Sequence, residues 1–202
     1  MRYLYLCFIV FALYSCKSEH ERTVHTKKGE IIRYGNQGID NREAAALFNK
    51  GLQSVEERDF YSAEEYFQKA DSIEKDNSAI LNALALTCEK FDNDEEAERI
   101  YTRIFSKDSS TIATYANYGR FLLYREQPKE ANKLLLKGYK YTIESNKYPE
   151  PALIMNLAIS YSELKDCKSA IKYAREAQEY AQNKDLKSRI AVIIQHIREK
   201  CQ

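Results

Sequence analysis

The chain has 202 residues, of which 44% are hydrophobic, enough for one folded domain. Its 31 Lys and Arg balance 30 Asp and Glu to a net charge of +1, which argues against a nucleic-acid-binding protein. Because only six Gly and three Pro are present, the composition favours helices over a turn-rich β architecture.

The first fifteen residues have the features of an export signal. Arg2 supplies a positive charge, and residues 3–14 form an apolar stretch that Lys17 and Glu19 end. A bilayer span needs about twenty apolar residues, so this stretch is too short to be an anchor helix. We therefore predict a signal peptide over residues 1–15.

The signal ends in Leu13-Tyr14-Ser15-Cys16, which resembles the lipobox of bacterial lipoproteins. The resemblance implies cleavage before Cys16 and attachment of diacylglycerol and a further acyl chain such as palmitate to that residue. The alternative is a chance cysteine after an ordinary signal peptide. Residues 16–43 are polar without a sustained period, so we predict a flexible tether with a reach of roughly 25–30 Å.

Beyond the tether, the chain repeats itself every 34 residues. Small or apolar residues recur in register in three copies, and a fourth copy follows after a slip of five residues. The repeats are predicted over residues 44–77, 78–111, 112–145 and 151–184. The aligned columns are Gly51, Ala85, Gly119 and Ala158; Ala63, Ala97, Ala131 and Ala170; and Phe67, Tyr101, Leu135 and Ala174.

This period, with its small-residue columns, resembles the tetratricopeptide repeat (TPR) family. The apolar spacing agrees, because each copy holds two stretches of about thirteen residues with a period near 3.6, separated by a turn such as 125–128. The predicted fold class is therefore all-α, a TPR solenoid of helix-turn-helix repeats with a C-terminal capping helix.

The predicted capping helix covers residues 185–202, with Asp185 as its N-cap and Leu186, Ile190 and Ile194 at helical spacing. An amphipathic helix that binds membranes is the alternative. Cys167 and Cys201 lie one repeat length apart, so they could form a disulfide or remain free thiols. Cys88 is expected to be a small core residue.

Catalytic and metal-binding patterns are absent from the sequence. The three histidines, His20, His25 and His196, are scattered, and there is no zinc spacing, phosphate loop or nucleophile elbow. The acidic run 92–96 is interpreted as a helix start. We therefore expect that the protein is not an enzyme and that it binds no cofactor, metal, small-molecule substrate or nucleic acid.

The first helices of stacked repeats are expected to line a concave groove that binds an extended or helical peptide of a cell-envelope protein. The groove prediction comprises Phe48, Asn49, Leu52, Asn82, Leu86, Asn117, Arg120, Leu123, Tyr124, Met155, Asn156 and Ile159. Asn recurs there either to contact a peptide backbone or because the repeat favours it. Ala45, Ala79, Ala113 and Ala152 fill the positions of a lysine clamp, so a chaperone tail is not expected.

Residues 115–122, 148–153 and 156–158 look like the type IV pilus biogenesis lipoproteins (PilW/PilF). This resemblance implies a lipid-anchored scaffold of the bacterial cell envelope, at the outer membrane, that assists assembly of a secretin or pilus-type complex. Two alternatives stay open. One is an adaptor that docks or regulates a periplasmic protease or peptidoglycan hydrolase, and the other is a surface-exposed nutrient-uptake lipoprotein.

Overall fold

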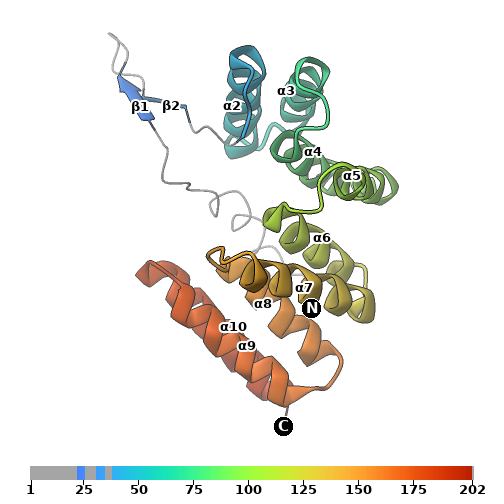
Figure 1. Ribbon diagram of the computed structural model, residues 1–202, viewed down its shortest axis with the longest axis vertical. Coiled ribbons are helices and arrows are strands. Elements are labelled where there is room, and N and C mark those ends of the chain that lie inside the picture. Colours follow the sequence, from blue (N-terminus) through green and yellow to red (C-terminus); the bar gives the residue numbers. More distant parts are fainter. Residues whose placement is uncertain (1–21, 26–30, 35–37, 202) are drawn as a thin grey trace. The chain divides into compact units, whose positions relative to one another are not determined.

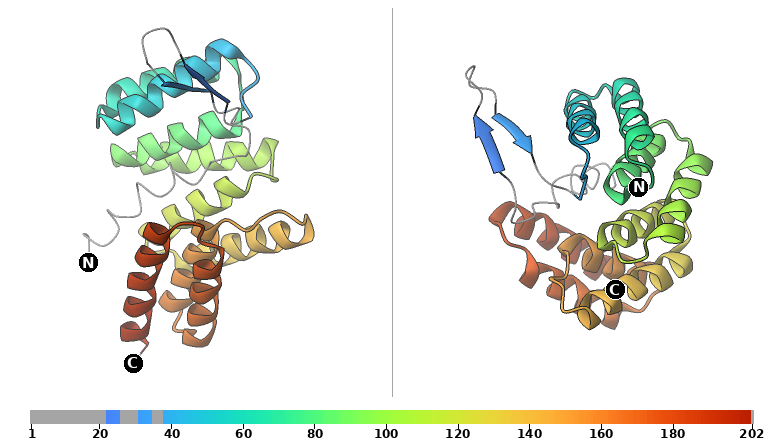
Figure 2. Two further views of the ribbon diagram at one scale, coloured as in Figure 1. Left: turned by 90° about the vertical axis from the view of Figure 1, so that its left-hand side faces the viewer. Right: turned by 45° about the horizontal axis from the view of Figure 1, so that its top comes forward.

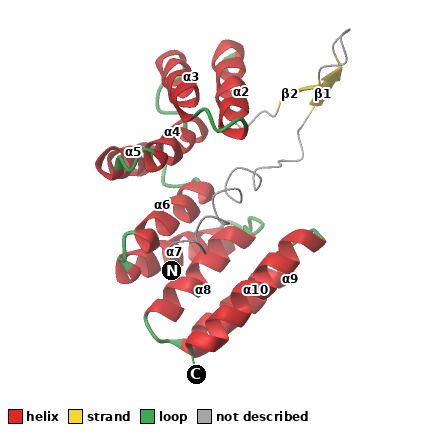
Figure 3. Ribbon diagram, turned by 180° about the vertical axis from the view of Figure 1, so that it is seen from behind, coloured by secondary structure: helices red, strands yellow, loops and turns green. Residues whose placement is uncertain are grey.

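The computed structural model of the protein describes residues 22–25, 31–34 and 38–201, and most of these are helical (Figures 1 and 3). They form two compact units: an N-terminal unit that ends at Ser109 and a C-terminal unit that begins at Ser110. The units are described separately below. The all-α class predicted from the sequence is confirmed for the repeats.

The N-terminal unit contains two helix pairs, in which each helix packs against the next along the chain. The helices are α2 (Arg42–Glu56), α3 (Phe60–Ile73), α4 (Ser78–Lys90) and α5 (Asp94–Lys107). The predicted ranges 44–77 and 78–111 each contain one pair, although α2 begins two residues earlier than predicted. Asn41 sets that start, because its side chain accepts from the backbone N–H groups of Glu43 and Ala44, at 2.9 and 3.2 Å.

A short β-hairpin precedes the helices, within the range predicted as a flexible tether. Strands β1 (Arg22–His25) and β2 (Ile31–Tyr34) pair antiparallel, with Arg22 opposite Tyr34 and His25 opposite Ile31. Thr23, Val24, Ile31 and Ile32 are β-branched and favour strands. Strands of four residues are too short to give a periodic signal in the sequence, which is why the hairpin was not predicted.

The C-terminal unit contains two further pairs and one more helix (Figure 2). The helices are α6 (Ile112–Tyr124), α7 (Pro128–Glu144), α8 (Pro151–Glu163), α9 (Cys167–Tyr180) and α10 (Lys184–Lys200). The predicted N-cap of the last helix, Asp185, lies two residues too late, because the N-cap is Asn183, whose side chain accepts from the Leu186 N–H at 2.8 Å. Asp185 lies in the first turn instead, 2.9 Å from Arg189.

The turn between the two helices has the same backbone conformation in all four pairs. Each turn places a single non-glycine residue at a positive φ of 54–64°: Arg58, Asp92, Glu126 and Lys165. The next N–H then reaches back five residues, as from Asp59 to the Ser54 carbonyl at 2.8 Å. The shared geometry directs the second helix of every pair back along the first.

Within a pair, the two helices approach closely at the small-residue columns. A Cβ atom on Gly51 would overlap the ring of Phe67, and one on Gly119 would overlap the side chain of Leu135. The two helices could not keep these contacts with a larger residue at either position. The small residues therefore set the spacing of the pair, as the repeat pattern predicted.

Helix α10 covers the end of the C-terminal unit by packing against α8 and α9, beside which it lies in Figure 1. It buries Ile190, Ile194 and Ile197 in a cluster that includes Ile154 and Ala174. A disulfide joins Cys167 at the start of α9 to Cys201 after α10, with a Cα–Cα distance of 5.7 Å. The capping helix is thereby held by packing along its length and by a covalent bond at its end.

Candidate protein-binding surface

The first and second helices of the pairs differ strongly in burial. The first helices α4, α6 and α8 each bury eight of their thirteen residues, whereas the second helices α3, α5, α7 and α9 bury three or four. These three first helices therefore have neighbours on most sides and leave only a narrow strip accessible, whereas the first helix α2 buries four of its fifteen residues. Any ligand of the first helices has to bind along that strip.

In the N-terminal unit, the predicted groove residues divide between the core and this strip. Phe48 and Asn82 are buried, whereas Asn49, Leu52 and Leu86 are partly exposed. The Asn82 amide donates to the Ser78 carbonyl of its own helix, at 2.7 Å. The accessible part of this strip is therefore mainly aliphatic.

The C-terminal unit divides its predicted groove residues in the same way. Four are buried, two are partly exposed, and Tyr124 is 45% exposed. The buried four are Asn117, Leu123, Met155 and Asn156, and the partly exposed two are Arg120 and Ile159. The Asn156 side chain donates to the backbone carbonyl of Ala116 at 3.0 Å, which links the neighbouring first helices α8 and α6.

The amides of Asn82 and Asn156 therefore bond within the repeat stack, which favours the alternative that the repeat itself uses Asn at these positions. A buried amide must be satisfied, and a neighbouring backbone carbonyl is the nearest partner. The groove residues that remain accessible are Asn49, Leu52 and Leu86 in one unit, and Arg120, Tyr124 and Ile159 in the other.

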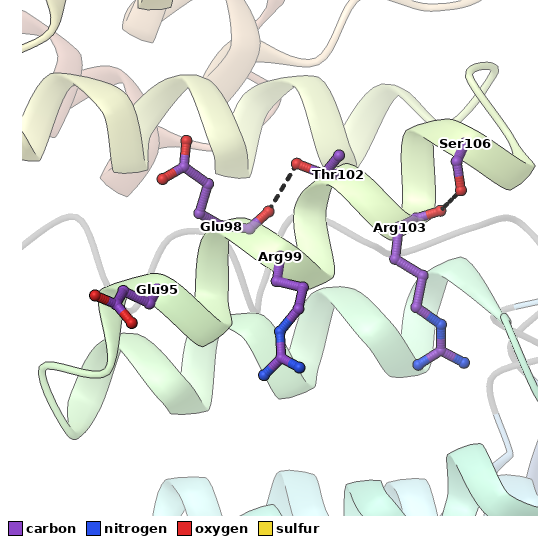
Figure 4. A pocket seen from close by; sticks show the side chains of 6 residues that line it. All are labelled: Glu95, Glu98, Arg99, Thr102, Arg103 and Ser106. Carbon is purple, nitrogen blue, oxygen red and sulfur yellow. Dashed lines mark hydrogen bonds between the residues drawn. The ribbon is translucent and has the colours of Figure 1, made fainter.

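The outer face of α5 carries a shallow hollow (Figure 4). Its lining comes from one helix: Glu95, Glu98, Arg99, Thr102, Arg103 and Ser106. The hydroxyls of Thr102 and Ser106 bond to carbonyls of the same helix, at 2.9 and 2.7 Å. Arg103 binds Asp76 at 2.7 Å and Asp71 at 3.1 Å. These three of the six lining residues therefore already bond within the N-terminal unit.

Other site predictions have simple outcomes. Across the described residues, no group of three or more His, Cys, Asp or Glu side chains could hold a metal ion. Burial raises the pKa of the Cys88 thiol to about 11, so this residue is an unreactive part of the core. None of the described helices is long and apolar enough to cross a membrane. The signal peptide and Cys16 lie outside the described residues.

Charge is divided unevenly along the chain. Residues 41–109 contain 16 acidic and 9 basic side chains, whereas residues 110–202 contain 10 acidic and 16 basic ones. The net charges of −7 and +6 cancel almost completely in the total of +1. The net charge of the whole chain therefore conceals this difference, which counting charges by predicted repeat would have revealed.

Comparison with known proteins supports the repeat fold. No family model matches the chain, and no curated protein matches its sequence. Among solved structures, PilF of Pseudomonas aeruginosa is similar with a TM-score of 0.64 and 21% identity, over 81% of this chain and 77% of that one. PilW, described as a widely conserved type IV pilus biogenesis factor, is similar with a TM-score of 0.62 and 15% identity, over 80% of this chain and 77% of that one.

A thermophilic TPR protein from Thermus thermophilus is also similar, with a TM-score of 0.65 and 14% identity, over 76% of this chain and 82% of that one. The fold is therefore that of TPR proteins, built from helix-turn-helix repeats with a capping helix. The resemblance to PilW and PilF noted in the sequence is confirmed at the level of fold.

Proposed function

We propose that this protein is a non-catalytic scaffold of the bacterial cell envelope that binds a protein partner through the exposed strips of first helices in its two units. The observation that carries this proposal is the accessible apolar character of the strip in each unit. Leu52 and Leu86 in the N-terminal unit, and Tyr124 and Ile159 in the C-terminal unit, retain accessible surface after the repeats have packed. Apolar positions at helical intervals suit an extended or helical peptide.

We also propose that acylated Cys16 anchors the scaffold to the outer membrane. The Leu13-Tyr14-Ser15-Cys16 sequence after a short apolar stretch supports this proposal. Incorporation of labelled palmitate into the wild-type chain, and its loss in Cys16→Ala, is the expected result. Labelling that persists in Cys16→Ala would contradict lipidation at this residue.

The particular role proposed is assistance in the assembly of a secretin or pilus-type complex. It is supported by the similarity in fold to PilF and PilW, together with the sequence features shared with pilus biogenesis lipoproteins. The repeat fold itself accommodates many partners, so the partner has to be identified through the strip.

The experiment is a crosslinking pulldown from membranes with the double variant Leu86→Glu/Tyr124→Glu. The matched control is Tyr61→Glu/Val192→Glu, which makes the same kind of change at side chains that are 77% and 65% exposed on other helices. We expect one envelope protein to be lost from the strip variant and kept by the control, with helicity unchanged in both. Equal recovery from both would place binding elsewhere and overturn the proposal. A pilus or secretin component as the lost protein would establish the pathway.

A further inference from the structure

The outer face of α7 carries a straight row of lysines. Lys129, Lys133, Lys137 and Lys140 are all exposed and recur once per turn, within an arc of about 80° on the helix surface. The buried residues of α7 lie on the opposite side of the helix: Ala131, Leu135, Gly138 and Thr142. The row therefore points directly away from the core.

Helix α9 continues this positive surface. Lys168, Lys172 and Arg175 are exposed on the side opposite the buried Ala170, Ala174 and Ala177. The two helices are neighbours, because the Tyr139 hydroxyl of α7 donates to the Glu176 carboxylate of α9 at 2.6 Å and the rings of Tyr139 and Tyr173 lie 5.4 Å apart. The seven cations therefore lie on the outer faces of two adjacent helices, called here together the cationic face.

The cations of this face have no carboxylate partners within the described residues. Among the described residues, no carboxylate forms a salt bridge with any of the seven, and Lys172 lies over the Tyr173 ring at 5.0 Å. Two exposed carboxylates share these sides of the helices: Glu144, at the end of α7 within the arc of the lysines, and Glu179, at the end of α9. An array of unpaired like charges repels itself, so the repeat has no structural need for it.

The other repeats show that these positions can hold different residues. Four columns run through the outer faces of the second helices: Tyr61, Glu95, Lys129 and Lys168; Glu65, Arg99, Lys133 and Lys172; Lys69, Arg103, Lys137 and Glu176; and Ser72, Ser106, Lys140 and Glu179. These four positions carry a net charge of 0 in α3, +1 in α5, +4 in α7 and 0 in α9. The unbroken row of lysines is therefore particular to α7.

We propose that the cationic face binds the anionic headgroups of a phospholipid membrane. Anionic lipids attract cations at a protein surface, and the attraction requires no defined pocket. Ile143 follows one turn after Lys140 on the same side of α7 and is 52% exposed, which suits insertion between headgroups. The inference goes beyond the proposed scaffold function and requires neither the first-helix strip nor acylation.

The test is flotation with vesicles, using the chain from residue 16 with Cys16→Ser so that no acyl chain contributes. Vesicles of phosphatidylcholine with about 30% phosphatidylglycerol resemble a bacterial surface charge, and pure phosphatidylcholine is the neutral reference. We expect binding at least tenfold stronger to the anionic vesicles. Because the attraction is electrostatic, the binding should fall sharply in about 0.5 M salt, where the Debye length is only about 4 Å.

The decisive variant is Lys133→Gln/Lys137→Gln/Lys140→Gln, compared with Arg42→Gln/Lys50→Gln/Lys75→Gln, which removes three exposed cations from the N-terminal unit. We expect the first to weaken vesicle binding at least tenfold and the second less than threefold. Equal losses, or no preference of the wild type for anionic vesicles, would overturn the proposal. So would a salt-sensitive dimer, seen by sedimentation, that depends on the three lysines while vesicle binding is absent, because the face would then serve an acidic protein surface.

Discussion

The N-terminal and C-terminal units build the same helix pairs but carry net charges of opposite sign. In both units, the turn inside a pair has one residue with a positive φ, and the next N–H donates to the carbonyl five residues earlier. Each unit also has one pair in which a glycine packs against a large apolar side chain. Their second helices nevertheless differ, since α5 exposes Glu95 and Ser106 where α7 exposes Lys129 and Lys140.

This difference shows which positions the repeat constrains. A residue between two helices has to match the volume available, so the buried columns stay small or apolar in every copy. An exposed residue on a second helix contacts mainly water and can take any charge without a packing cost. The outer columns are therefore where one repeat can acquire a function that its neighbour lacks.

The largest expected difference between the units comes from the disulfide, which only the C-terminal unit has among the described residues. Cys167→Ser/Cys201→Ser should lower the stability of that unit by about 3–4 kcal/mol, because the bridge closes a loop of 34 residues. Hydrogen exchange would show faster opening of α10 and unchanged protection of α2–α5. Reduction of the wild type is the control and should reproduce the effect. Unchanged exchange in α10 would contradict the prediction.

The shared close contacts predict equal losses in the two units. Gly51→Val and Gly119→Val should each cost about 2–3 kcal/mol, because a side chain there overlaps Phe67 or Leu135. Urea unfolding measures the loss, and Ala46→Val, at an exposed position of α2, serves as the control with an expected change below about 0.5 kcal/mol. A tolerated Gly119→Val would show that the pair can separate without penalty.

A smaller effect concerns Glu150, at the N-cap position of α8, where its side chain accepts no cap hydrogen bond. Desolvation raises the pKa of this carboxyl from an ordinary 4.5 to about 7. Between these values the folded chain keeps a proton that the unfolded chain releases, so the stability of the C-terminal unit should fall as pH rises to 7 and then level off.

Glu150→Gln should remove this pH dependence and raise stability by about 1–2 kcal/mol at pH 8, where the wild-type carboxylate is charged in both states. Urea unfolding at about pH 5 and pH 8 measures the change. Glu144→Gln, at an exposed carboxyl of α7, is the control. If the stability of the wild type does not fall between these two pH values, the pKa of Glu150 is not raised in the folded chain.

The N-terminal unit should respond to acid in the opposite direction, by the smallest amount. Arg103 binds Asp76 at 2.7 Å and holds the pKa of that carboxyl below its ordinary value. A lowered pKa contributes stability that is present above about pH 4 and is lost as pH falls further. The thermal midpoint of the wild type should therefore fall between about pH 5 and pH 2.5, and it should fall less in Asp76→Asn. The control Glu56→Gln should show the same fall as the wild type. If the midpoint falls equally in both variants, the Arg103–Asp76 ion pair does not cause the loss of stability in acid.

Several structural features could be predicted from local sequence signals. The 34-residue period located the helix pairs, and the turn at 125–128 was visible because Pro128 can begin a helix but not continue one. The hairpin at 22–34 was missed because two four-residue strands give no period. The start of α10 was misassigned because Asn183 and Asp185 are both good caps, and only backbone geometry shows which one accepts the hydrogen bond.

The candidate site was predictable only in part. Helical spacing placed the twelve groove residues on first helices, but it could not separate Leu86, which stays partly exposed, from Leu123, which is buried. Burial depends on how closely the neighbouring helix approaches, and that distance is a property of the packed stack. The hydrogen-bond partners of the Asn side chains could not be predicted for the same reason. Asn156, for example, donates to the carbonyl of Ala116, forty residues earlier in the chain.

The sequence by itself determined the repeat, its helices and the small-residue columns, because these follow from interactions within a few helical turns. Only the tertiary structure decided which side of each helix faces outward, and hence that four lysines of α7 and three cations of α9 lie on the outer faces of two adjacent helices. Charges far apart in the chain can act together only after packing has brought their helices side by side.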